Sequence, residues 1–459
     1  MKIVFLITEK IKGRPVEHVY GCSFALYPTP DLSTLYNAAV LQKAGHKVTL
    51  FRISSKKTLD RIPEAGAYFI QSVVLSQKID LLVGQKLSQK RVYYFGPAAT
   101  LDPEKYLKID GHFVLRGETE HYIKKALSNP QKTKCVSFRE GKEIVHNRTA
   151  GIINELDRIP FPARELDRGI YFNPKLDLRK STIVLSSRGC ANRCYFCVPN
   201  SISWARELEW KKTHLGKPPV TIRSAENVLS ELKLLKKQGY QEFSFIDDQF
   251  IVDKERVLNI LKGIARLNLP FGILARADRL DEEIVKSLAQ AGCRYVDIGA
   301  ESFDQEVLDD IKKDLRVETI EKAIKLLDKH GIEVKLNIMF GTSDKETKKK
   351  IRRTIEKTLR LPVSTCMFSL ATPFPGTEFA KKAKRKGYFV DNKKLNPMGK
   401  ALISYPHLSS FDLEKLAREA NKKFYFRRKI ILKQLKKIKN LRSGKLTLGM
   451  VKNFVKNLK

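Results

Sequence analysis

The strongest constraint on the fold is the alternation of strand-like and helix-like segments along most of the chain. Short apolar runs alternate with longer stretches in which apolar residues recur at every third or fourth position. Such alternation is typical of α/β proteins with parallel sheets. A chain of 459 residues has room for about three domains. The sequence therefore predicts an α/β protein with more than one domain.

We expect four regions. Residues 1–131 predict a small doubly wound parallel sheet, and residues 132–175, which contain three prolines, predict a connector. Six strand patterns separated by five helical patterns predict a partial (β/α)6 barrel over residues 176–390. Residues 391–459 are helical in pattern and predict a basic helical C-terminal region.

The charge balance is strongly positive, with 87 Lys and Arg against 50 Asp and Glu, a net charge of +37. Fourteen basic residues and no acid lie between Asn421 and Lys459. Such a field attracts nucleic acid, anionic lipid or phosphorylated substrates, and a merely solvated basic surface is the alternative. No apolar run is long enough to span a membrane, and the apolar start is too short for a signal peptide. We expect a cytoplasmic protein, with peripheral membrane association as an option.

Seven cysteines are too few for a disulfide framework. Four of them are scattered and are expected to be small buried apolar residues, namely Cys22, Cys135, Cys293 and Cys366. The other three, Cys190, Cys194 and Cys197, lie within eight residues, just after a strand pattern. Three thiolates at this spacing can hold one metal centre. A structural zinc site needs a fourth ligand, and none follows at zinc spacing, whereas a 4Fe–4S cluster held by three cysteines leaves one iron open.

The spacing CxxxCxxC, with the aromatic Phe196 before the last cysteine, resembles the radical S-adenosylmethionine (radical SAM) superfamily. The resemblance implies that Cys190, Cys194 and Cys197 ligate a 4Fe–4S cluster and that Phe196 lies at the cofactors. It further implies that the open iron binds SAM, and that reductive cleavage of SAM yields a 5′-deoxyadenosyl radical. An external electron donor of the flavodoxin or ferredoxin type is implied as a partner.

Later segments extend the resemblance across the barrel. Phe245–Phe250 resembles the FxDDxF segment of cobalamin-binding radical SAM proteins, which implies that Asp247 and Asp248 hold the amino group of SAM. Helix capping by these two aspartates is the alternative. Arg276 matches the arginine that follows the third barrel strand in the family.

Two further matches follow the fourth and fifth barrel strands. Glu301 lies in a segment that resembles the family's GxES motif, and we expect it to contact the ribose or the methionine part of SAM. Gly341 matches a glycine that packs near the adenine in the family. The usual Gly-Leu-Pro is Gly-Thr-Ser in this chain.

The N-terminal region resembles the cobalamin-binding domain that precedes some radical SAM barrels. The matching segments include Ala39–Gly45, Gly96–Thr100 and Gly117–Glu120. A doubly wound sheet binds ligands beyond the C-terminal ends of its strands. Gly96 and Pro97 follow such an end, and we expect them to contact bound cobalamin. A domain that no longer binds cobalamin is the alternative.

One segment of the N-terminal region contains a histidine that could be taken for a cobalt ligand. Asp110-Gly111-His112 looks like the start of the DxHxxG motif that ligates cobalt in other cobalamin domains, but it lies in the wrong loop. The segment Glu9–Gly13 after the first strand contains no histidine. We therefore expect bound cobalamin to lack a histidine ligand from the protein.

The resemblance implies an enzyme in which cobalamin carries a methyl group to an unactivated carbon of a small-molecule or lipid substrate. Non-methylating radical chemistry, such as cyclisation, rearrangement or carbon–carbon coupling, is an alternative, because a fold does not select a reaction. RNA modification in the manner of tRNA methylthiotransferases is another, although those enzymes carry more cysteines ahead of the barrel. A basic nucleic-acid-binding protein with a structural cluster is the non-enzymatic alternative. The sequence assigns no general base and no substrate-binding residue.

The tail from Phe424 to Leu441 has the pattern of a basic amphipathic helix. It could lie on an anionic membrane or bind RNA. We favour a third alternative for the apolar stripe, namely that this side of the helix packs against the barrel.

Overall fold

The computed structural model describes residues 1–11, 14–20, 27–390 and 400–436. Cys22 and the end of the basic tail lie outside these ranges. The chain forms two compact units. The first contains Met1–Tyr171, Ser187–Ala191 and Pro199–Arg223, and the second contains Phe172–Ser186, Asn192–Val198 and the chain from Ser224 onward. Both are α/β units with parallel strands, as the sequence predicts.

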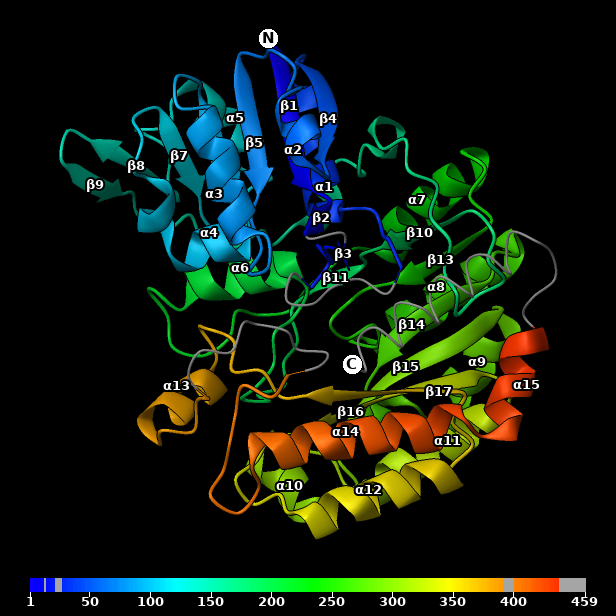
Figure 1. Cartoon of the computed structure of the whole chain (residues 1–459). Helices are drawn as coiled ribbons and strands as arrows, with labels where there is room; N and C mark the ends of the chain where they lie inside the picture. The colour runs from blue at the N-terminus through cyan, green and yellow to red at the C-terminus, as the bar shows by residue number, and fades with distance from the viewer. Residues whose placement is uncertain (12–13, 21–26, 391–399, 437–459) are drawn as a thin grey trace. The chain divides into compact units, whose positions relative to one another are not determined.

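The first unit is built on a seven-stranded sheet with the order β4-β1-β5-β6-β7-β8-β9 (Figure 1). Its first five strands are parallel. These strands are β4 (Lys47–Ile53), β1 (Lys2–Thr8), β5 (Ala67–Gln71), β6 (Val92–Phe95) and β7 (His112–Leu115). The chain winds outward in both directions from β1 and β5, which are neighbours. The place between β1 and β5, where the direction of winding reverses, is the switch point of the sheet. In doubly wound sheets, ligands bind at the switch point, outside the C-terminal ends of the strands.

Strand β1 shows why the sheet is covered on both faces. Ile3 and Phe5 belong to one apolar cluster, whereas Val4 and Leu6 belong to a second. Alternate residues of a strand point to opposite faces, so both faces of β1 are buried. The helices of this unit are α1 (Leu32–Lys43), α2 (Lys56–Leu59), α3 (Gln77–Lys86), α4 (Pro97–Leu101), α5 (Ile123–Ser128) and α6 (Ser201–Trp210).

The region expected to be a connector, 132–175, is more structured than the sequence analysis predicted. It contains β8 (Val136–Glu140) and β9 (Glu143–His146), an antiparallel hairpin that extends the first sheet beyond β7. The turn between them contains Gly141 at a φ of 59°, a conformation that glycine adopts readily. The prolines that suggested a connector all lie after this hairpin.

The second unit is a six-stranded, wholly parallel sheet with the order β10-β13-β14-β15-β16-β17. Its strands are β10 (Ser181–Val184), β13 (Glu242–Phe245), β14 (Phe271–Ala275), β15 (Cys293–Glu301), β16 (Glu333–Phe340) and β17 (Thr365–Leu370). Sequential order without closure between β10 and β17 is the partial (β/α)6 barrel that the sequence predicts.

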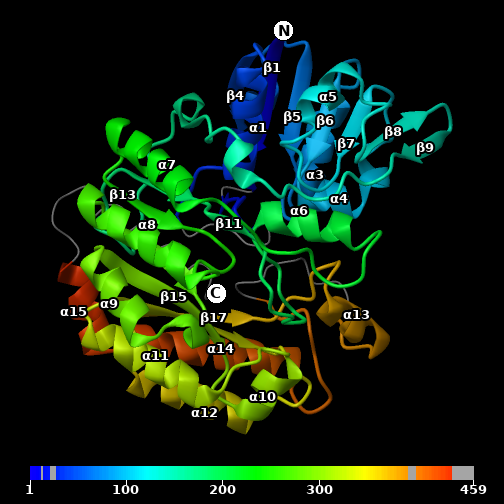
Figure 2. The same cartoon turned by 180° about the vertical axis from the view of Figure 1, so that it is seen from behind.

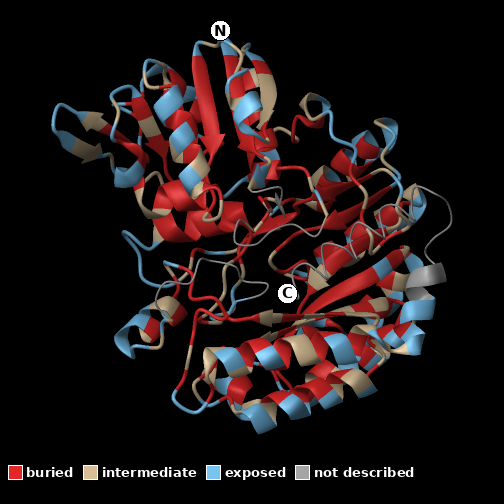
Figure 3. Ribbon diagram, viewed as in Figure 1, coloured by how far each residue is buried: buried red, intermediate tan, exposed pale blue. Residues whose placement is uncertain are grey.

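Five helices connect these strands, namely α7 (Ala225–Lys237), α8 (Lys254–Leu267), α9 (Glu282–Gln290), α11 (Val317–Lys329) and α12 (Lys348–Arg360). Seen from behind, α7, α8 and α9 run side by side over β13–β15 (Figure 2). The residues of the strands are almost all buried or half-buried, with buried and half-buried residues alternating along β16 and β17, whereas the helices expose their outer sides (Figure 3). Short helices α10 (Gln305–Asp310) and α13 (Glu378–Arg385) complete the barrel region.

The C-terminal region forms α14 (Ser410–Tyr425) and α15 (Arg428–Lys436). α14 packs against β17 and α12. Phe424 is fully buried in the large core of this unit, and the Tyr425 hydroxyl donates to the carbonyl of Cys366 at 2.7 Å. Ile430 is buried as well, whereas Ile431 and Leu432 are exposed. The packing that we favoured from the sequence therefore holds for Phe424 and Ile430, and Ile438 and Leu441 lie outside the described residues.

Within the described ranges, no helix combines the length and the apolarity that a bilayer requires.

Candidate functional site

The C-terminal edge of the second sheet gathers most residues that the sequence analysis singled out. Asp247 comes two residues after β13, Arg276 directly follows β14, Glu301 ends β15, and Gly341 directly follows β16. Since neighbouring parallel strands end at the same edge, these four residues form a row along one end of the partial barrel. This is the face of α/β barrels that carries chemistry.

Asp247 is buried and holds two strand ends together. One carboxylate oxygen accepts from the backbone N–H of Ser186 at 2.6 Å, and the other accepts from the Ser186 hydroxyl at 2.8 Å. Ser186 follows β10, the neighbour of β13. Asp248 is half-exposed and is the more accessible carboxylate of the pair. Gln249, which the sequence analysis did not single out, accepts from the backbone N–H of Arg276 at 3.1 Å.

Arg276 is buried and makes several protein contacts. Its guanidinium pairs with the two carboxylate oxygens of Asp278 at 3.0 and 3.2 Å. It also donates to the carbonyls of Lys313 at 2.9 Å and Asp314 at 3.0 Å. Arg276 therefore fixes the turn around Lys313, a residue that the sequence analysis missed because nothing nearby in sequence marks it.

Glu301 and Lys313 form a buried ion pair, with 3.0 Å between the carboxylate oxygen and the ammonium nitrogen. Glu301 has a φ of 63° at a bulge where the pairing of β15 with β16 shifts. Burial by itself lowers the pKa of Lys313, but the Glu301 carboxylate and the nearby Cys194 thiol outweigh burial and raise it. The turn thus places a buried cation close to a motif cysteine.

Gly341 is held through both of its backbone polar groups. Its N–H donates to Glu346 at 2.5 Å, and its carbonyl accepts from the Tyr405 hydroxyl at 2.9 Å. Its φ is 80°, and a Cβ there would lie 3.0 Å from a methyl carbon of Leu413. Burial raises the pKa of Glu346 to about 8, so this carboxyl group is mostly protonated at neutral pH. The glycine is required here by local packing.

A second polar cluster lies farther down the second sheet. Asp297 of β15 accepts from Lys335 at 2.8 Å, from Lys175 at 3.1 Å and from Asn337 at 3.0 Å. Burial raises the pKa of Asp297, but the two lysines outweigh burial and lower it. Lys175 also lies over the ring of Tyr295, 4.2 Å from the centroid. These contacts attach the segment before β10 to the strands of the same unit.

The motif cysteines differ from the other described cysteines in exposure. Cys190, Cys194 and Cys197 are half-exposed, whereas Cys135, Cys293 and Cys366 are buried, as expected. Burial raises the pKa of the Cys135 thiol to about 11 and also raises those of Cys293 and Cys366. Buried thiols of high pKa are inert, so the motif thiols are the ones suited to bind metal.

The motif is divided between the two units. Cys190 belongs to the first, whereas Cys194 and Cys197 belong to the second, in a turn closed by the Cys197 N–H on the Cys194 carbonyl at 3.2 Å. Within the described ranges, no three histidine, cysteine or carboxylate side chains are already gathered as a metal site. Phe196 packs against the large core of the second unit.

The loop that carries Cys190 is held in the first unit by buried charges. Arg188 pairs with Glu118 at 2.8 Å and with Glu120 at 2.9 Å. Arg206 of α6 pairs with Glu118 at 3.2 Å and donates to the Arg188 carbonyl at 3.0 Å. All four side chains are buried. The Gly117–Glu120 segment, which sequence reasoning treated only as a family match, therefore anchors the cysteine loop; we call this the Glu118–Arg188 cluster.

Gly96 and Pro97 lie after β6 at the C-terminal edge of the first sheet, as expected from the sequence. Gly96 has a φ of 94°, and a Cβ there would lie 2.9 Å from the carbonyl oxygen of Ser72, which follows β5. The two strand ends approach so closely that only glycine fits. His112 lies at the start of β7, the opposite edge, and its ring contacts Tyr94 and Leu87. This placement excludes the Asp110-Gly111-His112 segment as a ligand motif at the C-terminal edge.

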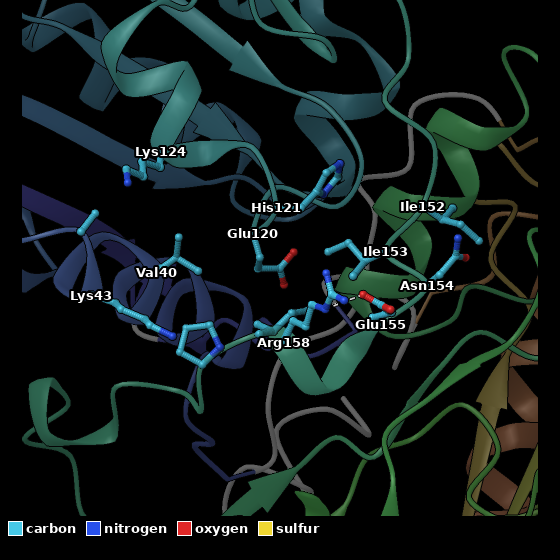
Figure 4. Close-up of a pocket in the computed structure, with 13 residues that line it drawn as sticks. Val40, Lys43, Glu120, His121, Lys124, Ile152, Ile153, Asn154, Glu155 and Arg158 are labelled. Carbon is cyan, nitrogen blue, oxygen red and sulfur yellow. Dashed lines mark ion pairs between the residues drawn. The ribbon is translucent and has the colours of Figure 1, made fainter.

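A pocket of about 730 Å³ opens on the first unit (Figure 4). It lies between the end of α1, the start of α5 and residues 152–160. Its lining includes three basic side chains, Lys43, Lys124 and Arg158, beside the apolar residues Ile152 and Ile153. None of the residues that the sequence analysis singled out as cofactor or metal contacts lines it.

The chain is similar to several known proteins. Residues 184–356 match the Radical SAM superfamily. The chain is 28% identical over 360 residues to uncharacterized methyltransferase PH0819 of Pyrococcus horikoshii, covering 74% of this chain and 73% of that protein. It is 27% identical over 335 residues to an anaerobic magnesium-protoporphyrin IX monomethyl ester cyclase of Synechocystis sp., covering 66% of this chain and 63% of that one.

Among solved structures, the fold is similar to that of the cobalamin-dependent S-adenosylmethionine radical enzyme OxsB with aqua-cobalamin and S-adenosylmethionine bound. The TM-score is 0.70 at 16% identity, covering 100% of this chain and 71% of that one. The matched segment 184–356 begins at the last residue of β10, includes all three motif cysteines and ends within α12. Residues 184–356 therefore form a domain of the Radical SAM superfamily.

Proposed function

We propose that this chain is a cobalamin-dependent radical SAM methyltransferase that acts on an unactivated carbon of a small-molecule substrate. The proposal rests on two features that occur together in one chain. The first is the set of three half-exposed motif cysteines. The second is a doubly wound sheet with buried polar side chains at its switch point. Relatives named as methyltransferases and the fold of a cobalamin-dependent radical enzyme support it.

The residues present fit a 4Fe–4S cluster and SAM. Cys190, Cys194 and Cys197 would hold the cluster, and their partial exposure leaves the thiols accessible. When bound, the cluster supplies the electron that cleaves SAM. Lys313 places a positive charge near Cys194, where it would stabilise an anionic group such as a carboxylate. Asp248 would face the ammonium group of SAM, while Asp247 holds the two strand ends in place.

The residues at the switch point of the first sheet also fit a large cofactor. The ends of β1 and β5 carry buried polar side chains, and one buried ring nitrogen, Nδ1 of His18, has no hydrogen-bond partner in the described residues. Gly96 keeps the adjoining strand ends close. Cobalamin bound here would supply the methyl group that is transferred.

The test is anaerobic reconstitution of the whole chain with iron, sulfide and hydroxocobalamin. We expect a 4Fe–4S EPR signal that SAM perturbs, about one retained cobalamin per chain, and conversion of reduced cobalamin to methylcobalamin on addition of SAM. The Cys194→Ser variant should lose the cluster and SAM cleavage but retain cobalamin. Reconstituted protein that retains no cobalamin would refute the methyltransferase proposal.

A second candidate function is non-methylating radical chemistry, and the relative named as a cyclase favours it. The two candidates differ in the fate of the SAM methyl group. Methyl transfer consumes two SAM molecules per product and places the label of methyl-labelled SAM in the product. A turnover that leaves the product unlabelled would select the second candidate.

A further inference from the structure

The loop after β1 contains a buried histidine that the sequence analysis did not consider. His18 is 7% exposed, and its Nε2 lies 2.9 Å from the carbonyl oxygen of Thr8, the last residue of β1. A carbonyl can only accept, so Nε2 carries the proton. In the neutral ring, Nδ1 is then an unprotonated nitrogen with a lone pair.

Nδ1 of His18 is buried and has no hydrogen-bond partner among the described residues. Leaving a buried polar atom unsatisfied is unfavourable, so a buried nitrogen without a partner calls for an explanation such as a bound ligand, ion or water. Histidines that bind metals typically donate their other ring N–H to a carbonyl or carboxylate, which fixes the tautomer and the ring orientation. His18 has this arrangement before any metal is bound.

The position of His18 matches the place where this fold binds ligands. Thr8 ends β1, and β1 and β5 are the neighbours from which the first sheet winds outward (Figure 1). The crevice at such a switch point, beyond the C-terminal ends of the strands, is the ligand site of doubly wound sheets. The hydroxyl of Thr8 donates to Asp80 at 2.7 Å, and Ser72 beyond β5 donates to the same carboxylate at 2.7 Å. These contacts fix the ends of β1 and β5 relative to each other.

The backbone of the histidine loop is fixed as well. The Ser201 hydroxyl donates to the carbonyl of His18 at 2.6 Å, and the Ser201 N–H donates to the carbonyl of Val19 at 2.6 Å. Ser201 begins α6, which packs against α4 in the same unit. The imidazole is therefore positioned by its own hydrogen bond to the end of β1 and by the hydrogen bonds between its backbone and the start of α6.

We propose that Nδ1 of His18 coordinates the cobalt of a corrinoid bound at the switch point of the first sheet. This inference rests on the proposed function, because it requires a corrinoid to bind. It departs from the expectation that bound cobalamin lacks a histidine ligand, which rested on the resemblance and on the absence of histidine from residues 9–13. Coordination forms one cobalt–nitrogen bond and needs no redox partner.

The test uses the whole chain loaded anaerobically with cobinamide, a corrinoid that has no nucleotide base of its own, and reduced to cobalt(II). A resolved splitting by an axial nitrogen in the EPR spectrum must then come from the protein, because the corrinoid itself supplies only the nitrogens of its ring. We expect each high-field cobalt line to be split into a triplet by one ¹⁴N nucleus. Protein grown with ¹⁵N-histidine should give doublets instead. This measurement needs no variant, so it does not depend on whether a substituted chain folds.

The residue is assigned with His18→Ala, which should retain cobinamide but lose the splitting, and regain it on addition of imidazole. His214→Gln is the matched control, because it removes an exposed imidazole of the same unit and should leave the triplet unchanged. Bound cobinamide without nitrogen splitting, or splitting that persists in His18→Ala, would overturn the inference. Failure to retain either cobinamide or cobalamin would instead refute the proposed function.

Discussion

At the scale of single residues, unusual backbone conformations occur at the end of β15 and in the turn around Lys313, which follows α10. Glu301, Lys312 and Asp314 all have positive φ values, of 63°, 53° and 50°. A non-glycine residue in this region costs roughly 1 kcal/mol or more, and such strain is commonest at functional sites. Here the strained turn holds an ammonium group near Cys194, with Glu301 as its partner. We infer that Lys313 contributes to the electrostatics of the bound cluster.

Replacing Lys313 should therefore change the reduction potential of the cluster. A nearby positive charge favours the reduced, more negative cluster, so Lys313→Gln is expected to lower the midpoint potential by tens of millivolts. The measurement is an EPR-monitored redox titration of reconstituted protein. Lys312→Gln is the control, since this neighbouring side chain is 58% exposed and pairs with Glu378 on the surface. Equal potentials in the wild type and the Lys313 variant would contradict the assignment.

At the scale of elements, the loop with Cys190 depends on charges supplied by the loop after β7. Arg188 and Arg206 are buried, and Glu118 pairs with both of them. Removing one partner from a buried ion pair typically costs about 3–5 kcal/mol, because the remaining charge stays buried without compensation. The Glu118–Arg188 cluster therefore links the stability of the first unit to the position of the first motif cysteine.

We expect Glu118→Gln to lower the free energy of unfolding by about 3–5 kcal/mol and to reduce the iron content after reconstitution. Urea unfolding followed by circular dichroism, together with an iron assay, measures both effects. Glu155→Gln makes the same substitution in an exposed pair with Arg158 and should cost less than about 1 kcal/mol. If Glu118→Gln behaves like Glu155→Gln, the cluster does not hold the loop.

At the scale of the whole molecule, the net charge of +37 dominates encounters with other macromolecules. An external reductant of the flavodoxin or ferredoxin type, which we propose as the electron donor, would be attracted if it is acidic. Electrostatic steering raises association rates by about 10-fold to 1,000-fold at low salt and is screened as ionic strength increases.

The rate of cluster reduction by an acidic flavodoxin should therefore fall at least about tenfold between about 0.05 M and about 0.5 M salt. Stopped-flow absorbance of the cluster gives the rate. Reduction by dithionite, a small reductant, is the comparison and should change much less. A flavodoxin rate that does not depend on salt would contradict electrostatic recruitment.

The sequence determined the architecture because its signals are local. Alternating apolar periods predicted both parallel sheets, and the spacing of Cys190, Cys194 and Cys197 identified the radical SAM domain. The burial of Cys135, Cys293 and Cys366 followed from their isolation. These properties depend on neighbours within a few residues, which a single sequence displays directly.

Only the tertiary structure decided which distant residues meet. The Glu118–Arg188 cluster joins residues about seventy positions apart, and Lys313 approaches Cys194 across more than a hundred. The hairpin of β8 and β9 was hidden in a segment expected to be a connector. His18 became a candidate ligand only because folding buries its ring with Nε2 on the carbonyl of Thr8 and leaves Nδ1 without a partner. Such contacts arise when separate elements pack together, so no local sequence pattern predicts them.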